Sequence, residues 1–303
     1  MFLYMLTGIL ALLWGLSFLG IKVALEFAAP IEVLAVRWVL AFLVFTILIL
    51  CKVIKVDYRG KNLKPLILAA FIQPCAYALL ETWGINLTTA SESSIFIALI
   101  PLVVVILSRV FLKQKVSLKV LGAILLSFAG VLVCIVFSPD FSTGSKYIGY
   151  LVLVATILTG ASYAVIAKKI NSAFSAMEIT YVLTIEASIF FNTLSLLSGH
   201  GFHGYQVMFS NMQALGAFLF LGIGCSCCAY MIFNYTISRL RVAVASNIQA
   251  NAITVVGVLA GIFLGGEPWG WYTAVGLAMT IAGIWITSQE GMKDQMESVN
   301  KGD

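Results

Sequence analysis

Charged residues are scarce in this chain of 303 residues. Only 10% are Asp, Glu, Lys or Arg, whereas 61% are hydrophobic. A water-soluble domain with this composition could not bury or cover its apolar side chains, so a soluble protein is excluded. Histidine clusters, phosphate-binding glycine loops and Ser-His-Asp arrangements are missing from the sequence as well. We therefore expect a protein that is not an enzyme.

Potential metal and disulfide ligands are also few. The two histidines, His200 and His203, supply too few ligands for a metal site, and we expect them in a solvated loop. The six cysteines lie in or beside apolar stretches, where small residues usually pack helices together. No metal, cofactor or disulfide framework is indicated.

The apolar residues gather in ten long stretches. At roughly 17–22 residues each, these stretches are long enough to span a bilayer, and their connections are short. They predict an all-α integral membrane protein with ten transmembrane helices. The stretches lie at roughly 4–24, 32–51, 65–84, 91–111, 118–137, 147–167, 177–198, 213–235, 243–265 and 271–288.

The two halves of the sequence repeat each other. Cys75-Ala76-Tyr77 recurs as Cys228-Ala229-Tyr230, and Ser93 and Ile95 recur at the same offset as Ser246 and Ile248. Five helices is an odd number, so the second copy must cross the bilayer in the opposite sense. The sequence predicts two inverted five-helix repeats around a central cavity, at residues 1–140 and 141–288, followed by a cytoplasmic tail at 289–303.

Basic residues alternate between the loops, which predicts the orientation. Lys and Arg follow helices 2, 4, 6 and 8, whereas Lys146 is the one basic residue assigned to loops on the opposite side. Cytoplasmic loops are enriched in Lys and Arg, so we expect both termini in the cytoplasm and the chain in the cell (inner) membrane. The net charge of +5 then points to the lipid bilayer as a partner, and not to nucleic acid.

The order of several short motifs resembles a known family. Both halves of the sequence are similar to the EamA-type domain of the drug/metabolite transporter superfamily. The resemblance implies ten helices, a central substrate cavity and movement of a small metabolite by alternating access. The motifs are Trp14-Gly15, Lys22, Pro30, Arg37, Pro101, Gly122 and Ala129-Gly130, then Gly160, Tyr163, Lys168, Leu264-Gly265-Gly266-Glu267, Gly276 and Ala282-Gly283.

Polar residues form matched stripes in the third helix of each half. Gln73, Tyr77 and Glu81 are spaced four residues apart and share one helix face. Ser226, Tyr230 and Asn234 stand at the equivalent positions of the second half. These stripes favour a substrate path, because polar groups inside a membrane are costly and usually functional. Interhelical hydrogen bonds are the alternative.

Glu186 is the acid expected nearest to the bilayer centre. It lies about nine residues into its helix, or roughly 14 Å at 1.5 Å per residue. Three roles are open: a counter-charge for a cationic or zwitterionic substrate, a proton-binding group for coupled transport, and a protonated acid bonded within the bundle.

Charges of both signs map to the outer ends of the first four helices. Lys22, Arg37 and Glu92 are the candidates for a gate or for ion pairs, with Glu26, Glu32 and Glu81 nearby. The alternative is that Arg37 or Lys22 binds a substrate carboxylate, for which the forked guanidinium of Arg is suited.

Further candidates for the cavity come from aromatic and amide residues. Rings there could stack on a planar or cationic ligand or simply pack. Pro101 predicts a kink in the fourth helix that its counterpart in the ninth lacks. The candidates added here are Trp14, Ser17, Tyr163, Asn247 and Asn251.

The resulting prediction is a secondary transporter for a small polar metabolite. Amino acids or related compounds are the first class to test, with export as the family-based default. Uptake or exchange of a larger cofactor-like solute, such as a nucleoside-containing cation, is the alternative. The oligomeric state is left open.

Overall fold

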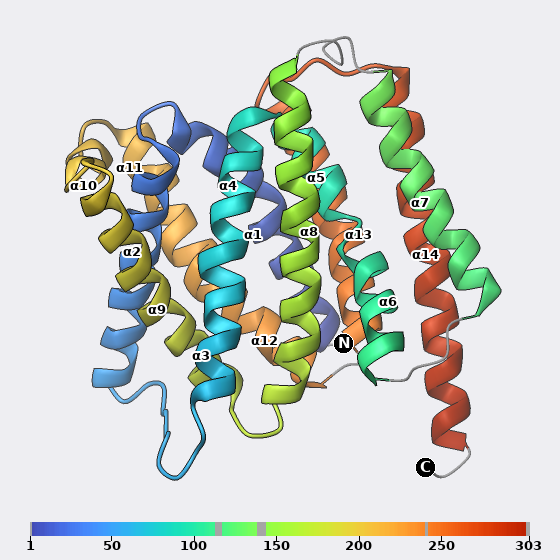
Figure 1. The fold of residues 1–303 in the computed structure, drawn as a ribbon, viewed down its shortest axis with the longest axis horizontal. Coiled ribbons are helices and arrows are strands. Elements are labelled where there is room, and N and C mark those ends of the chain that lie inside the picture. Colours follow the sequence, from blue (N-terminus) through green and yellow to red (C-terminus); the bar gives the residue numbers. More distant parts are fainter. Residues whose placement is uncertain (1, 113–116, 138–143, 240–241, 301–303) are drawn as a thin grey trace.

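The computed structural model describes residues 2–112, 117–137, 144–239 and 242–300. Within these residues the regular secondary structure is entirely helical (Figure 1). The elements are α1 (Phe2–Leu25), α2 (Pro30–Leu50), α3 (Lys64–Ala70), η1 (Phe71–Tyr77), α4 (Ala78–Leu87), α5 (Ala90–Ile97), α6 (Ile100–Leu112), α7 (Leu118–Val136), α8 (Gly144–Ile170), α9 (Ala176–Leu197), α10 (His203–Met208), α11 (Met212–Leu219), η2 (Phe220–Ala229), α12 (Tyr230–Arg239), α13 (Val242–Phe263) and α14 (Trp271–Asn300).

Expected and observed helices agree closely in position. Among the described residues, seven helical stretches are long and apolar enough to cross a membrane, and shorter apolar helices lie at Leu121–Cys134 and Ala252–Phe263. The all-helical membrane class is therefore confirmed, whereas the count of ten spans remains a prediction. The segment after residue 288, expected to be a tail, continues α14 as a helix to Asn300.

Two of the long helices change their winding near the middle. η1 is a π-helical segment between α3 and α4, and η2 is its counterpart between α11 and α12. In η1, Pro74 lacks the N–H needed for a regular helical hydrogen bond, which favours a wider turn. η2 adopts the same winding without a proline. The repeated Cys-Ala-Tyr tripeptides lie where these segments meet α4 and α12.

The fourth predicted span is interrupted. α5 ends at Ile97 and α6 begins at Ile100, so Pro101 occupies the first turn of a new helix, where its missing N–H is tolerated. The corresponding helix of the second half, α13, is continuous. The predicted difference between these two helices is confirmed.

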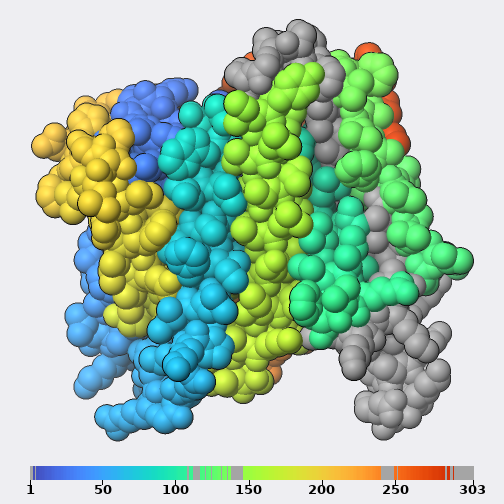
Figure 2. All heavy atoms as spheres, in the orientation of Figure 1, coloured from blue at the N-terminus to red at the C-terminus, as the bar shows by residue number. Residues whose placement is uncertain are grey.

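Helices from the two ends of the sequence interleave. α1 lies against α13 and η2, α2 lies against α9, and α8 lies against α4 and α6. Figure 2 shows one face of this arrangement, where α9, the α3–α4 rod and α8 pack side by side. The interior between these helices is therefore lined by both halves of the sequence.

α7 and α14 form a closely packed pair at one edge of the molecule (Figure 1). Gly130 and Gly276 face each other so closely that a Cβ on either would overlap the other helix. The outward side of α7 is apolar and exposed, as at Leu121 and Leu125. Such a surface suits a lipid environment.

Candidate functional site

A small cavity lies among the central helices. It encloses about 80 Å³, several times the roughly 10–15 Å³ that one water needs on the same measure. Helices from both halves contribute its wall. The lining residues are Trp14, Ser17, Phe18, Arg37, Gln73, Tyr77, Glu81, Ile97, Ile100, Pro101, Gly160, Tyr163, Ala164, Tyr230, Phe233, Gln249, Ala250 and Ile253.

Arg37 brings a buried positive charge to this cavity. The residue is 2% exposed, and its Nε donates a hydrogen bond of 2.5 Å to Ser226 Oγ of η2. Its guanidinium carbon lies 5.7 Å from the ring centroid of Trp38, a favourable cation–π distance. Within the described structure, however, Arg37 Nη1 has no hydrogen-bond partner. A buried donor of this kind is costly unless a ligand or water satisfies it.

Gln73 and Glu81 place acceptors in the same cavity. Gln73 Nε2 donates to the Tyr230 hydroxyl at 2.9 Å, while Gln73 Oε1 is buried and has no partner among the described residues. The Tyr77 hydroxyl donates to Glu81 Oε1 at 2.9 Å. Glu81 is buried and close enough to Arg37 for their charges to interact. Arg37, Gln73 and Glu81 therefore bring a guanidinium, an amide and a carboxyl group to the lining of one cavity.

The local fold explains how the polar stripe reaches the cavity. Gln73 and Tyr77 belong to the widened turns of η1, and Glu81 follows one α-helical turn later in α4. Across from them, Gly160 of α8 leaves room for the Tyr77 ring, because a Cβ there would approach the ring to 2.9 Å. π-helical segments of this kind are often found at functional sites.

One wall of the cavity is aromatic. The Trp14 ring lies 5.2 Å from Tyr230 and 5.0 Å from Phe233, and Tyr163 stacks on Phe233 at 6.1 Å, all between ring centroids. Trp14 Nε1 donates to the Cys225 carbonyl at 3.3 Å, which fixes the indole. The Ser17 hydroxyl donates back to the Trp14 carbonyl at 2.7 Å.

Several residues predicted for the site lie elsewhere. Asn234 is buried behind the cavity, where Oδ1 accepts from Tyr163 and Nδ2 donates to Thr180. Glu186 does not reach the cavity, because it borders a separate hollow formed by its own helix α9, with Phe190 among the lining residues. A sequence predicts how far along a helix a residue lies more readily than it predicts which neighbouring helix the side chain points toward. The side chains of Asn247 and Asn251 fall outside the described part of the structure.

The sequence interpretation also missed a lining residue. Gln249 lines the cavity, and its Nε2 donates to Thr236 at 2.8 Å. Its spacing from Ile253, four residues along the same helix, was the available signal. Gln73 and Tyr230 line the cavity and also bond to each other across helices, so interhelical hydrogen bonds are present, whereas the substrate path stays a prediction.

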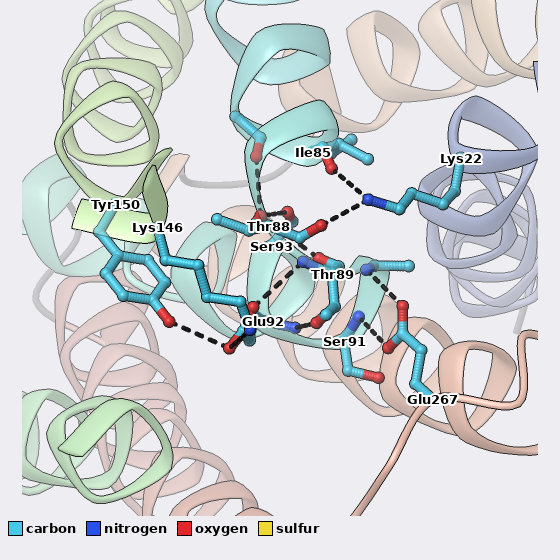
Figure 3. Close-up of polar contacts among 12 residues, drawn as sticks. Lys22, Ile85, Thr88, Thr89, Ser91, Glu92, Ser93, Lys146, Tyr150 and Glu267 are labelled. Carbon is cyan, nitrogen blue, oxygen red and sulfur yellow. Dashed lines mark hydrogen bonds and ion pairs between the residues drawn. The ribbon is translucent and has the colours of Figure 1, made fainter. Parts of the chain in front are cut away.

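Polar contacts tie helix ends together (Figure 3), where α4 meets α5 at the end of the molecule opposite the C-terminal end of α14 (Figure 1). Lys22 Nζ donates to the carbonyls of Ile85 and Thr88 at 3.0 and 2.6 Å, at the C-terminus of α4. Glu267 accepts hydrogen bonds from the backbone N–H groups of Ala90 and Ser91 at 2.6 and 2.9 Å, at the N-terminus of α5. Both charges complement the helix dipole that they face.

Glu92 completes this network with an ion pair. Its Oε1 lies 3.3 Å from Lys146 Nζ and accepts from the Tyr150 hydroxyl at 3.0 Å (Figure 3). Glu92 Oε2 accepts from the N–H of Thr89, which begins α5. Of the three residues predicted for a gate or ion pairs, Glu92 thus pairs with a cation, Lys22 holds backbone carbonyls, and Arg37 lies in the cavity.

The histidines are not simply solvated. His203 Nδ1 lies 2.8 Å from Glu32 Oε1 at the start of α2, and His200 Nδ1 lies 3.8 Å from the same oxygen. Both side chains are exposed, as expected for a solvated connection, but this connection also contains the short helix α10 and packs against α2. Among the described residues, no group of three or more His, Cys, Asp or Glu side chains is arranged to hold a metal ion.

Comparison with protein families identifies the architecture. Residues 1–136 and 147–289 each match the model of the EamA-like transporter family. The chain belongs to the EamA-like transporter family. The resemblance to the drug/metabolite transporter superfamily is thereby confirmed, and so is a multi-pass membrane setting.

Curated relatives of this EamA member are named as transporters. An uncharacterized transporter, YcxC, of Bacillus subtilis is 28% identical and spans 89% of this chain and 87% of its own length. A "probable terminal-alkyne amino-acid exporter" of Streptantibioticus cattleyicolor is 24% identical over 80% of this chain and 79% of its own. An S-adenosylmethionine/S-adenosylhomocysteine transporter of Chlamydia trachomatis is 27% identical over 62% of this chain and 58% of its own.

A solved crystal structure has the same overall fold. It aligns with a TM-score of 0.70 and 17% identity, covering 95% of this chain and 97% of that structure. At this identity the likeness concerns the fold alone. Taken together, the family and the relatives indicate a membrane transporter that acts on a small-molecule substrate.

Proposed function

We propose that this protein is a secondary transporter that carries a small polar metabolite across the cytoplasmic membrane through its central cavity. Amino acids or closely related compounds are the proposed substrate class, and export is the proposed direction. The supporting observation is the pair of opposite charges, Arg37 and Glu81, that line one buried cavity. A zwitterion carries the complementary pair of charges.

The unpartnered polar atoms suggest how such a solute binds. A substrate carboxylate would accept from Arg37 Nη1, whose forked guanidinium suits two carboxylate oxygens. A substrate ammonium would donate to Gln73 Oε1 and face Glu81. Each new hydrogen bond would satisfy a group that is otherwise buried without a partner.

The aromatic wall supplies the rest of the binding surface. Trp14, Tyr230 and Phe233 offer apolar ring surface beside the polar groups. An apolar side chain of an amino acid would pack there.

The alternative is uptake or exchange of a nucleoside-containing cation. The S-adenosylmethionine/S-adenosylhomocysteine transporter among the relatives favours it, and aromatic rings can stack on a base. Such solutes share an α-amino-acid group with the amino acid exported by the Streptantibioticus relative. Arg37 and Gln73 would recognise that shared group in either case. The two candidate substrates would differ in how the rest of the solute contacts the cavity.

Alternating access supplies the proposed mechanism. Both halves of the sequence line the cavity, so a rocking movement between them would expose it to one side at a time. The break before Pro101 and the glycines of α13, Gly257 and Gly261, are the proposed moving parts. Glu186 lies away from the cavity and is retained as the candidate group for proton coupling. The proposed orientation keeps both termini in the cytoplasm.

Matched ligands test the proposed substrate class. The thermal stability of the purified protein would be measured with an amino acid, with the amine that lacks its carboxylate, and with the acid that lacks its ammonium. We expect stabilisation only by the compound with both groups, because ligands that bind the folded state raise its stability. Equal stabilisation by the amine would contradict the role of Arg37. Stabilisation confined to nucleoside-containing cations would favour the alternative.

A further inference from the structure

α2 and α9 begin in the same way at opposite ends of the molecule. These helices pack against each other, and each carries a buried glutamate in its first turn. Glu32 Oε2 accepts from the N–H of Ala29 at 2.7 Å, and Glu178 Oε2 accepts from the N–H of Ser175 at 2.8 Å. In both cases the other carboxylate oxygen is turned toward a neighbouring connection.

Each of these connections comes from the opposite half of the sequence. Lys61 Nζ lies 2.9 and 2.7 Å from the two oxygens of Glu178, and His203 Nδ1 lies 2.8 Å from Glu32 Oε1. We call the first contact the lysine latch and the second, with His200 beside it, the histidine latch. Figure 1 shows α10 and the 51–63 connection at opposite ends of the molecule.

A tyrosine accompanies each latch. The Tyr58 hydroxyl donates to the Glu178 carbonyl at 2.9 Å, beside the lysine latch. The Tyr205 hydroxyl donates to Asn192 Oδ1 of α9 at 2.6 Å and lies 3.5 Å from the Ala35 carbonyl of α2, beside the histidine latch. The two connections thus fasten the α2–α9 pair at both ends by the same kinds of contact.

The two latches differ in one chemical respect. A lysine stays cationic throughout the physiological pH range, whereas histidine as a residue type changes its charge between about pH 5 and 8. We propose that the histidine latch is a proton-binding site that fastens residues 198–210 to α2 when His203 is protonated and loosens when His203 is neutral. The lysine latch is its counterpart with a fixed charge.

The geometry favours a response centred on His203. Glu32 is 3% exposed, whereas the His203 side chain is 59% exposed and can exchange protons with water. A neutral imidazole can still hydrogen-bond to the carboxylate, but a charged donor makes a shorter and stronger bond. The contact with Glu32 is therefore stronger when His203 is charged than when it is neutral.

The two neighbouring tyrosines do not duplicate this response. Burial, opposed in part by the Asn192 hydrogen bond, raises the pKa of Tyr205, so its hydroxyl keeps its proton near neutral pH. Burial and the nearby Glu178 charge raise the pKa of Tyr58 in the same direction. α11, which packs against α2 and α10, carries no titratable side chain. Arg37 lies on α2 itself, and Glu26 lies between α1 and α2. The other charged or titratable groups on helices packed against α2 are Tyr4, Lys22, Glu81, Tyr181 and Glu186, with the cysteines of η2.

Three of these groups sit in contacts of their own. Lys22 holds the end of α4, Arg37 bonds to Ser226, and Glu81 bonds to Tyr77. Because α2 also carries Arg37 into the cavity, a proton on the histidine latch acts on a helix that lines the proposed binding site. In the proposed orientation this latch faces the outside, so external acid would hold the outer end closed.

Hydrogen–deuterium exchange of the ligand-free protein in lipid nanodiscs tests the latch. Protection of the amides in residues 198–210 and 51–63 would be compared at pH 5.5 and 7.5, after correction for intrinsic exchange. We expect protection of 198–210 to fall about two- to fivefold at the higher pH, the size of effect that a partly exposed ion pair produces. Protection of 51–63 should not change. No substrate is needed, so the result is independent of the proposed function.

Exchanging the two cations gives matched variants. His203→Lys should remove the pH dependence at 198–210, and Lys61→His should create one at 51–63. His200→Gln should retain most of the response. A wild-type protein whose protection at 198–210 is the same at both pH values would overturn the proposal. So would a His203→Lys variant that keeps the full response.

Discussion

Arg37 is a buried cation whose hydrogen bonds are only partly made by the protein. Nε is held by Ser226, while Nη1 is buried without a partner in the described structure, and the residue lines the cavity. Burying an incompletely bonded charge is expensive, and such a cost is usually retained where a ligand completes the bonding. At the scale of single residues, this donor is the strongest indication of where an anionic group of the substrate binds.

Replacing Arg37 should weaken substrate binding more than removing its hydrogen-bond partner Ser226 does. We expect Arg37→Gln to lower the affinity for an amino acid at least tenfold, because hydrogen bonds to charged groups contribute about 1.5–3 kcal/mol. Arg37→Lys, which keeps the charge but loses the fork, should give an intermediate affinity. Ser226→Ala is the matched control, since it leaves Nη1 in place. Titration calorimetry would measure all four proteins, and unchanged affinity in Arg37→Gln would disprove the carboxylate role.

Single positions show what the sequence could predict about the site. Gln73, Tyr77 and Glu81 were predictable as a group, because helical periodicity places them on one face and all three line the cavity. Glu186 was not, because its depth in α9 does not determine which way it points around the helix axis. For Arg37, the sequence favoured an ion pair, with a substrate carboxylate as the alternative. In the structure its Nε bonds to Ser226 of η2, and the carboxylate role stays a prediction.

At the scale of helices, charges placed at helix ends organise one end of the molecule. Glu267 accepts hydrogen bonds from the first free N–H groups of α5, and Lys22 donates hydrogen bonds to the last free carbonyls of α4. Neither role requires an ion pair. The sequence favoured ion pairs because the charges of these side chains nearly cancel. A count of charged side chains does not include the unbonded backbone groups at helix ends, which can bind the same charges.

Glu267→Gln should destabilise the protein by about 1 kcal/mol, since an amide retains one acceptor but loses the charge that faces the N-terminus of α5. Thermal unfolding of the purified protein would measure the change. Glu26→Gln is the control, because Glu26 is an exposed carboxylate at the end of α1. Equal stability of both variants would show that the Glu267 cap contributes nothing.

The α7–α14 pair depends on the absence of side chains at its contact. Gly276→Val would drive a branched side chain into Cys134 and the Gly130 carbonyl, and overpacking of this kind costs about 1–3 kcal/mol. The same substitution at Gly122 of α7 meets nothing within 4 Å and should be tolerated. Thermal unfolding separates the two variants. Similar losses in both would mean that helix propensity, and not packing, sets the cost.

At the scale of the whole molecule, most of the architecture follows from the sequence. Apolar length located the helices, and the repeated tripeptide located the paired π-helical segments without revealing their winding. The winding of a helix depends on local backbone hydrogen bonds, such as the one that Pro74 cannot donate, and on packing between helices that are distant in sequence. The contact of His203 with Glu32 was hidden for the same reason, because it joins residues from different halves.

The proposed orientation makes a direct prediction about the connections. Reporters of cytoplasmic location fused after residue 62 or after residue 300 should be active, because the alternating basic loops favour the cytoplasm. A reporter that needs an external location should be active when inserted near residue 210. The opposite pattern would reverse the orientation and would place the histidine latch in the cytoplasm.

The decisive measurement is counterflow in proteoliposomes. Vesicles that contain the purified protein would be loaded with unlabelled amino acids and diluted into a trace of the same amino acids carrying a radiolabel. We predict saturable, transient accumulation of label by the wild-type protein and by Ser226→Ala, and none by Arg37→Gln or by protein-free vesicles. Accumulation that does not saturate, or that Arg37→Gln retains in full, would contradict carriage of amino acids through this cavity.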